Sequence, residues 1–307
     1  MVRIAVVGAG QFGQNHCRIV KQSARAELTA VVDVDPARAP IANYRELEGK
    51  VDAAIVATPT SSHAEIGGWL LEHGIDVLVE KPMAPDLESA DRLIAAAERY
   101  GRVLQVGHLE RFNPAVTALE GRIALPLFFE IHRLSVFSPR SLDVDVILDL
   151  MIHDIDVVLS LTRAEPAEIR AAGVSILSPK VDIANARLQF PNGCVANLTA
   201  SRVSTERVRK LRLFQPRQYI SLDYARQDAV IYSVCDGKVS FEALAVAKGE
   251  PLGLQFDAFL DSLETRKSPN TSGRAARQTL RVALSILDKI REHSEIVSQT
   301  LASGWKQ

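Results

Sequence analysis

In the stretch Val6-Val7-Gly8-Ala9-Gly10-Gln11-Phe12-Gly13, a β-branched strand runs directly into a loop of the form GxGxxG. Between a strand and a helix, Gly8 permits a tight turn, Gly10 lets the backbone approach a pyrophosphate, and Gly13 lets helix and strand pack closely. The helix that opens with Gln11 and Phe12 offers unpaired N–H groups and its positive dipole end to phosphates. The loop therefore predicts a dinucleotide-binding domain.

An acidic residue at the expected distance supports this prediction. Asp33 follows the second β-branched run, Leu28–Val32, and lies 20 residues beyond Gly13. At that position a carboxylate accepts hydrogen bonds from the adenosine ribose, and it repels a 2′-phosphate. We therefore expect NAD rather than NADP as the cofactor, although Arg38 is close enough in sequence to leave NADP open.

Strand-like and helix-like patterns alternate over the first 110 or so residues. The alternation predicts βαβ units and a doubly wound parallel sheet, an α/β Rossmann domain. Helical periodicity lies between the strand-like runs, as in Ser89–Tyr100. The runs themselves are Arg3–Val7, Leu28–Val32, Ala53–Ala57, Asp76–Val79 and Val103–Val106.

The pattern changes after Pro114, and strand-like runs then follow one another without intervening helices. Such a succession predicts an α+β domain with a large, mostly antiparallel open sheet. We expect residues 1–120 to form the dinucleotide-binding domain and residues 121–307 the substrate-binding and oligomerisation domain. The strand-like runs are Leu127–Val136, Glu168–Leu177, Ile183–Phe190, Val195–Ser201, Arg209–Phe214, Tyr219–Tyr224 and Ala229–Val234; the helices are Val144–Leu161, Leu254–Arg266 and Gly273–His293.

Composition excludes several classes of protein. The 307 residues hold 36 Lys and Arg against 37 Asp and Glu, a balance that argues against a dedicated nucleic-acid binder. Three scattered cysteines support neither a disulfide framework nor a zinc site. No uncharged apolar run reaches the ~18 residues of a membrane span, and the N-terminal run is too short for a signal peptide. We expect a cytoplasmic protein that acts on a small molecule without a metal.

Further motifs extend over nearly the whole chain. They are Ala57-Thr58-Pro59 with His63, Glu80-Lys81-Pro82, Arg111-Phe112-Asn113-Pro114 and Asp149-Leu150-Met151-Ile152-His153-Asp154. In this order they resemble the glucose–fructose oxidoreductase/inositol dehydrogenase (Gfo/Idh/MocA) family, which implies an NAD(P)-dependent oxidation of a CH–OH group. The resemblance also implies that Thr58, Pro59, His63, Glu80 and Lys81 belong to the cofactor site, and that a cis bond precedes Pro82.

Three residues carry the chemistry that the resemblance implies: Lys81, Asp149 and His153 would surround the substrate carbon next to the nicotinamide. Lys81 follows a parallel strand, and its ammonium would stabilise charge developing on oxygen. His153 would accept the alcohol proton, and Asp149, four residues earlier on one helical face, would orient its ring. From the residues alone, both Glu80-Lys81 and Asp149/His153 also fit ordinary surface pairs. We interpret His16, Asp154 and Asp156 as helix-surface or helix-start residues.

Two stretches narrow the resemblance to one branch. Gly107–Pro114, and Ser138–Ser141 with Asp149–Asp154, are similar to UDP-N-acetylglucosamine 3-dehydrogenases. These enzymes oxidise the sugar 3-hydroxyl to a ketone, which transamination converts to a 3-amino sugar of the lipid A type. The resemblance implies UDP-N-acetylglucosamine as the substrate, with Arg111, Asn113 and Arg140 as substrate-binding candidates.

A basic stretch over residues 202–217 adds candidates for holding a diphosphate. Arg209, Lys210 and Arg212 offer charge-assisted hydrogen bonds, with Lys210 and Arg212 on one strand face and Arg209 on the other. The alternative is a charged sheet edge that prevents aggregation or joins an oligomer interface. Because an open sheet leaves an apolar face uncovered, we expect a homodimer or homotetramer.

Other functions stay open. A dehydrogenase of a free cyclic polyol or sugar, such as inositol or glucose, would give the basic stretch no phosphate to contact. A UDP-uronic acid is an intermediate substrate. A catalytically silent NAD(P)-binding redox sensor belongs to a different class; the joint presence of Lys81, Asp149 and His153 argues against it, since a sensor needs no proton relay.

Overall fold

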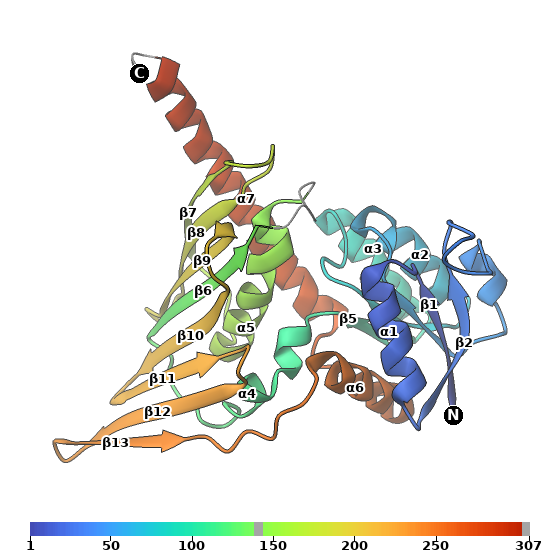
Figure 1. The fold of residues 1–307 in the computed structure, drawn as a ribbon, viewed down its shortest axis with the longest axis horizontal. Helices are drawn as coiled ribbons and strands as arrows, with labels where there is room; N and C mark the ends of the chain where they lie inside the picture. The colour runs from blue at the N-terminus through green and yellow to red at the C-terminus, as the bar shows by residue number, and fades with distance from the viewer. Residues whose placement is uncertain (138–143, 303–307) are drawn as a thin grey trace. The chain divides into compact units, whose positions relative to one another are not determined.

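The computed structural model describes residues 1–137 and 144–302, which form two compact units (Figure 1). Unit 1 comprises residues 1–112 and 249–280, and unit 2 comprises residues 113–248 and 281–307. The predicted domains, 1–120 and 121–307, differ from this division because the chain returns to unit 1 after residue 248. The two units are described separately below.

A parallel five-stranded sheet forms the centre of unit 1, in the strand order β2-β1-β3-β4-β5. The sheet confirms the predicted doubly wound fold, and its central strands are buried on both faces. The two neighbours of β1, β2 and β3, lie on opposite sides of it, so the order of the strands reverses at β1. In such sheets a crevice forms at the carboxyl ends of the strands where the order reverses, and ligands bind there. The strands are β1 (Val2–Val7), β2 (Ala26–Val32), β3 (Ala53–Val56), β4 (Asp76–Val79) and β5 (Leu104–Val106); α1 (Gln11–Gln22), α2 (Thr60–Glu72) and α3 (Leu87–Arg99) connect them, with a 3₁₀ turn η1 (Tyr44–Leu47).

Two segments from the end of the chain complete unit 1. They are helix α6 (Pro251–Thr265) and the first residues of α7 (Gly273–Ala302). Phe256 and Phe259 of α6 are buried against Ile4 of β1 and Ile19 of α1 in one apolar cluster. This packing explains why the sequence boundary near residue 120 misses the return of the chain: the helix pattern of α6 shows an apolar face, but not which sheet covers it.

An eight-stranded sheet forms unit 2, in the order β13-β12-β11-β10-β6-β9-β8-β7. Every neighbouring pair is antiparallel except β6 with β9, which confirms the predicted mostly antiparallel sheet. The strands are β6 (Phe128–Val136), β7 (Glu168–Val174), β8 (Ile183–Gln189), β9 (Val195–Ser204), β10 (Val208–Gln215), β11 (Gln218–Asp223), β12 (Asp228–Cys235) and β13 (Lys238–Ala243), and only β13 lacks a predicted counterpart.

One face of this sheet packs against helices. Alternate strand residues such as Leu211 and Leu213 of β10 are fully buried with Ile155 and Val158 of α5 (Ile152–Thr162) and Ile286 of α7. The intervening residues of β10 point to the other face and are exposed. The alternation therefore decides which side chains of each strand can approach α5.

The predicted helix Val144–Leu161 is interrupted. A π-helical turn, η3 (Ile147–Met151), comes directly before α5. Single π turns inside α-helices are rare and are frequent at functional sites. Short turns also follow β5, namely η2 (Leu109–Phe112) and α4 (Pro114–Thr117). Within the described residues no helix is both long and apolar enough to cross a membrane.

Candidate active site

The glycine loop joins β1 to α1, and the surroundings of each glycine fit the role expected for it. Gly8 adopts φ +96°, and a Cβ there would lie 2.7 Å from the carbonyl carbon of Ala57. A Cβ on Gly13 would lie 1.7 Å from the carbonyl oxygen of Gly8. A Cβ on Gly10 would meet nothing within 4 Å, so the start of α1 faces open space. Close packing at two glycines and an open approach at the third fit a pyrophosphate at the helix N-terminus.

Asp33 lies directly after β2 and is held beside the loop. Its Oδ2 accepts a hydrogen bond from Ala9 N at 2.7 Å, and its Oδ1 accepts one from Asp35 N at 2.9 Å. Burial alone raises the pKa of the Asp33 carboxyl, but the bonds from Asp35 and Ala9 outweigh it and hold the pKa below its usual value. Arg38 forms an ion pair with Asp35 at 3.2 Å. The site therefore presents a fixed negative charge, as a ribose-binding acid requires.

His63 connects the two segments that follow β3 and β4. Its Nδ1 lies 2.9 Å from the carbonyl oxygen of Pro82, and its Nε2 lies 2.8 Å from that of Thr58. The ring is buried, and burial lowers its pKa even though these bonds raise it. Both ring nitrogens thus contact backbone of the protein itself. Thr58 Oγ1 accepts a hydrogen bond from Ser62, and Pro59 is exposed at the start of α2.

The Glu80-Lys81-Pro82 motif follows β4, and its first residue is buried. Glu80 Oε1 lies 2.8 Å from His16 Nε2, and both side chains are less than a tenth exposed. Interpretations of Glu80-Lys81 as a surface pair and of His16 as a surface residue are therefore wrong. Lys81 is half-buried, and the Lys81–Pro82 bond is cis, as the family resemblance implied.

Asp149 and His153 occupy two kinds of helix. Asp149 lies in the π turn η3, half-buried, and its N–H donates to the carbonyl of Asp145 at 3.0 Å. His153 lies in the first turn of α5 and is only 8% exposed. The prediction of one regular α-helix over both residues is wrong, because the π turn directly precedes α5.

A buried ion pair holds the start of α5 on the sheet. Arg133 of β6 donates from Nε and Nη2 to the carboxylate of Asp154, at 2.8 Å each, and both side chains are at most 3% exposed. The guanidinium also lies over the ring of Tyr224, 5.1 Å from its centroid. Asp156 is buried as well. Asp154 does lie at the start of α5, as predicted, but neither Asp154 nor Asp156 faces solvent. The surface interpretation is wrong for both, because the burial of Asp154 depends on Arg133, which is distant along the chain.

The basic stretch separates onto two faces of the unit 2 sheet. Arg209 has the same parity as the buried Leu211, so it lies on the α5 face, opposite Arg133 in register. Lys210 and Arg212 are exposed on the other face, where Arg212 pairs with Glu130 at 2.9 Å. Of the three diphosphate candidates, only Arg209 therefore shares a face with His153.

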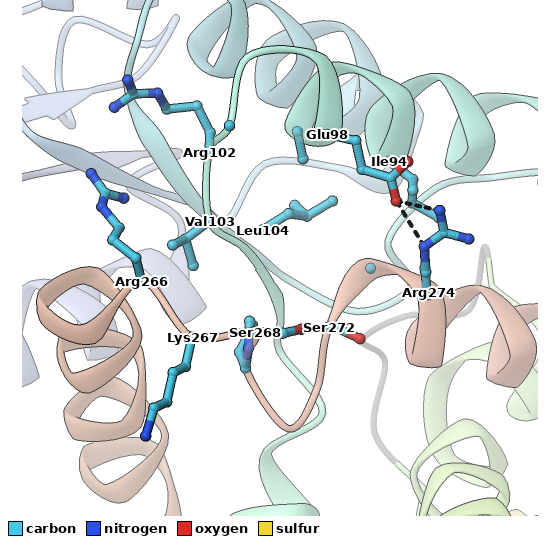
Figure 2. A pocket seen from close by; sticks show the side chains of 14 residues that line it. Ile94, Glu98, Arg102, Val103, Leu104, Arg266, Lys267, Ser268, Ser272 and Arg274 are labelled. Carbon is cyan, nitrogen blue, oxygen red and sulfur yellow. Dashed lines mark hydrogen bonds and ion pairs between the residues drawn. The ribbon is translucent and has the colours of Figure 1, made fainter.

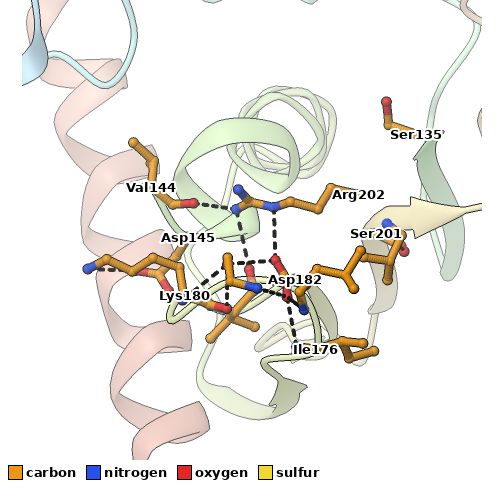
Figure 3. Close-up of polar contacts among 12 residues, drawn as sticks. Ser135, Val144, Asp145, Ile176, Lys180, Asp182, Ser201 and Arg202 are labelled. Atoms are coloured by element: carbon orange, nitrogen blue, oxygen red, sulfur yellow. Dashed lines mark hydrogen bonds and ion pairs between the residues drawn. The ribbon is translucent and has the colours of Figure 1, made fainter. Parts of the chain in front are cut away.

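Arg202, the first cation of the stretch, has a structural position (Figure 3). It donates to the carbonyl of Val144, shortly before η3, and lies 3.6 Å from Asp182. Asp182 is fully buried, and its carboxylate accepts hydrogen bonds from Ile176 N, Leu177 N and Ser178 N and Oγ. Although burial raises the pKa of Asp182, these bonds lower it to about 2. The network holds the β7–β8 connection.

The remaining substrate candidates have separate positions. Asn113 is buried; its Oδ1 accepts from Ala115 N at the start of α4, and its Nδ2 donates to the carbonyl of Tyr224 at 3.1 Å. Arg111 is half-buried in η2. Arg140 lies outside the described residues. Asn113 thus supports the fold around Tyr224.

Sequence reasoning missed several residues of these surroundings. His16 follows Gly13 by three residues and precedes Ile19 and Val20 by three and four, so helical spacing places it on the buried face of α1. That signal was available in the sequence. Arg133 and Tyr224 gave no such signal, because their partner Asp154 is distant along the chain.

A hollow in unit 1 lies away from these residues (Figure 2). It has a volume of about 520 Å³ and is lined by Leu104, Arg102, Arg266, Lys267 and Arg274, among others. It adjoins the amino end of β5, whereas the glycine loop follows the carboxyl end of parallel β1. Arg274 pairs with Glu98 and Arg266 with Asp76. In the described chain, no cluster of three or more His, Cys, Asp or Glu side chains could hold a metal ion.

Comparisons with known proteins agree with both halves of the structure. A family model for the oxidoreductase family with an NAD-binding Rossmann fold matches residues 2–108, and one for the GFO/IDH/MocA C-terminal domain matches residues 120–218. The UDP-N-acetylglucosamine 3-dehydrogenase of Acidithiobacillus ferrooxidans is 36% identical, over 93% of this chain and 96% of its own length. An inositol 2-dehydrogenase of an Arthrobacter species is 33% identical over 55% of this chain and 56% of its own.

Solved structures extend the likeness to three dimensions. The UDP-N-acetylglucosamine 3-dehydrogenase GnnA of Acidithiobacillus ferrooxidans superposes with a TM-score of 0.90, covering 94% of this chain and 97% of that one. A putative myo-inositol dehydrogenase of Sinorhizobium meliloti, 21% identical, shares the fold with a TM-score of 0.81 and covers 95% of this chain and 98% of its own. With a relative above 30% identity across nearly the full length, this chain belongs to the Gfo/Idh/MocA family of oxidoreductases.

Proposed function

We propose that this protein is an NAD-dependent dehydrogenase that oxidises the 3-hydroxyl of UDP-N-acetylglucosamine to a ketone. One observation carries the proposal: the similarity to a UDP-N-acetylglucosamine 3-dehydrogenase spans both units, whereas the inositol 2-dehydrogenase matches little more than half of the chain. A transaminase acting on the ketone would then give a 3-amino sugar, in the cytoplasm.

The glycine loop and Asp33 hold the cofactor in this proposal. Gly10 and the first turn of α1 receive the pyrophosphate, and Asp33 accepts hydrogen bonds from the adenosine ribose. The ion pair of Arg38 with Asp35 directs the nearest arginine toward a carboxylate rather than a 2′-phosphate, which supports NAD over NADP. When bound, NAD supplies the hydride acceptor.

Side chains of the protein itself accept the hydroxyl proton and stabilise the charges that develop. His153 accepts the proton of the 3-hydroxyl as the C3–H bond breaks, and the C–O bond becomes a carbonyl. Asp149 orients the His153 ring and stabilises its charged form. Lys81 stabilises the charge that develops on the 3-oxygen. Arg209, on the α5 face, and Arg111 are the remaining described candidates for the diphosphate.

The open face of the unit 2 sheet supports association with a second copy. An aromatic ladder crosses five adjacent strands of this face, with neighbouring ring centroids 4.9–6.5 Å apart; it consists of Phe128, Phe214, Tyr219, Tyr232 and Phe241. Phe241 is 74% exposed and Tyr232 41%. A row of exposed aromatic side chains of this extent is typical of an interface. We expect Tyr232→Glu with Phe241→Glu to convert a dimer or tetramer to smaller species in light scattering; an unchanged mass would place the interface elsewhere.

A substrate panel tests the catalytic proposal. Purified protein is mixed with NAD or NADP and with UDP-N-acetylglucosamine, its uronic acid, myo-inositol or glucose, and NADH or NADPH absorbance is followed with a ketone trap present. We expect reduction of NAD with UDP-N-acetylglucosamine.

Each other outcome of the panel has a definite meaning. Turnover on a free polyol or sugar alone would reject the sugar-nucleotide proposal. Turnover on the UDP-linked uronic acid alone would support a sugar nucleotide as the substrate but with a different sugar. Tight NAD binding without turnover on any member would favour the redox sensor.

A further inference from the structure

The side chain of His16 lies inside unit 1, with its own hydrogen-bonding partner. Its Nε2 is 2.8 Å from Glu80 Oε1, and the side chains of His16 and Glu80 are 1% and 8% exposed. The pair links the second turn of α1 to the residue after β4. Buried ion pairs add little net stability, because desolvation offsets their attraction, but they fix relative positions where their geometry is good.

The carboxylate of Glu80 is confined on two further sides. Its Oε2 accepts a hydrogen bond from the backbone N–H of Lys81 at 3.2 Å. Gly107, after β5, lies against it so closely that a Cβ on Gly107 would come within 2.7–2.8 Å of three carboxylate atoms. The N–H of Gly107 is itself held by the carbonyl of Val79 at 2.8 Å. Glu80 therefore has one available position, set by α1, β4 and β5 together.

We infer that His16 is a positioning residue, which fixes the backbone of Lys81 through Glu80. The helix that bears His16 is also the one capped by Gly10, where the proposed function has the pyrophosphate bind. One rigid element thus sets both the phosphate end of the cofactor and the start of the lysine segment. His16 touches neither cofactor nor substrate in this role; it sets where the Lys81 ammonium can reach. The inference rests on the proposed role of Lys81.

Removing His16 alone would leave a buried carboxylate without its partner and weaken the fold. The test therefore removes both polar side chains, in His16→Leu with Glu80→Met, which keeps the volume and leaves neither member of the pair without its partner. We expect a folded protein with a kcat lower by about 100-fold, the size of effect that a misplacement near 1 Å produces. NAD affinity should fall much less, because the glycine loop and Asp33 are intact. The substitution His16→Gln, whose Nε2 reaches a similar point, should retain most of the kcat.

A second variant, Gly107→Ala, keeps the side chains of both His16 and Glu80. Gly107→Ala introduces a methyl group against the Glu80 carboxylate, and we expect a fall in kcat with little change in NAD affinity. Gly68→Ala in α2 is the matched control, because a Cβ there meets nothing within 4 Å. An unchanged kcat in both the double variant and Gly107→Ala would overturn the inference, as would a loss confined to NAD binding.

A readout without substrate separates this inference from the proposed function. Acetic anhydride labelling of Lys81, measured by mass spectrometry, should be suppressed by NAD in the native protein and in His16→Gln. We expect NAD to protect Lys81 much less in the double variant. Equal protection in all three proteins would refute the role of His16, whatever the substrate. If protection follows the inference but Lys81→Ala retains full turnover, the catalytic role of Lys81 fails instead.

Discussion

Arginine side chains on the two faces of the unit 2 sheet have different surroundings. On the α5 face, Arg133 is buried with Asp154 and lies beside Arg209 in register. On the opposite face, Arg212 pairs with Glu130 in solvent, next to the aromatic ladder. Arg209 and Lys210 are neighbours in sequence, yet the pleat of the strand assigns them to different surroundings. Strand parity, rather than the density of positive charge, decides which cation can serve the site.

The largest expected effect concerns the α5 face. His153→Ala should lower kcat by about 10²–10⁴-fold, because it removes the side chain proposed as the general base for the alcohol proton. NAD affinity, measured by fluorescence titration, should stay unchanged, since the glycine loop and Asp33 are intact. A variant that retains wild-type turnover would eliminate His153 as the base.

The next effect compares a buried and an exposed ion pair. Arg133→Leu removes both hydrogen bonds that the guanidinium donates to the buried carboxylate of Asp154 and should lower the free energy of unfolding by about 3–5 kcal/mol. Arg212→Leu removes a pair between side chains that are 47% and 36% exposed, and should cost at most about 1 kcal/mol. Urea unfolding of both variants measures the difference. Equal losses would mean that the two faces hold their charges in similar environments.

A smaller effect concerns the β7–β8 connection. Asp182→Asn should lower the free energy of unfolding by about 1–3 kcal/mol, because an amide replaces a carboxylate that accepts several N–H bonds. The pKa of Asp182 is lowered from 3.8 to about 2 in the folded protein, so its ionised form stabilises the fold fully above about pH 4. That contribution is lost as the pH falls from 3.8 toward 2. The gap between native protein and variant should therefore narrow over this range in acid unfolding; a constant gap would contradict the assignment.

The smallest effect separates adjacent cations. Arg209→Gln should raise KM for the UDP-sugar by about tenfold, the loss of one charge-assisted contact, while Lys210→Gln leaves KM unchanged. Steady-state kinetics on both variants test the assignment of faces directly. A larger effect from Lys210→Gln would indicate that the diphosphate binds on the open face instead.

Unit 1 was predictable because its signals are local. The glycine loop and the alternating strands depend on short sequence patterns, Asp33 lies at a fixed spacing from the loop, and the structure agrees with all three. The residues that the sequence left out depend on contacts between distant segments. Glu80 contacts His16 and lies against Gly107, and Asp154 pairs with Arg133. No residue near either acid in the sequence indicates which partner it contacts. The basic stretch was ambiguous since composition does not reveal which face of a strand a helix will cover.

The return of the chain to unit 1 has a consequence for biosynthesis. Phe256 and Phe259 complete the apolar cluster around Ile4 and Ile19, so the first 112 residues leave the ribosome without part of their core. At translation rates of about 5–20 residues per second, roughly ten to thirty seconds pass before residue 280 is made. During that interval the nascent dinucleotide-binding segment exposes the apolar surface that α6 will cover. We expect chaperones that recognise apolar segments to bind it there. A gene fragment ending near residue 120 would keep that exposure permanently.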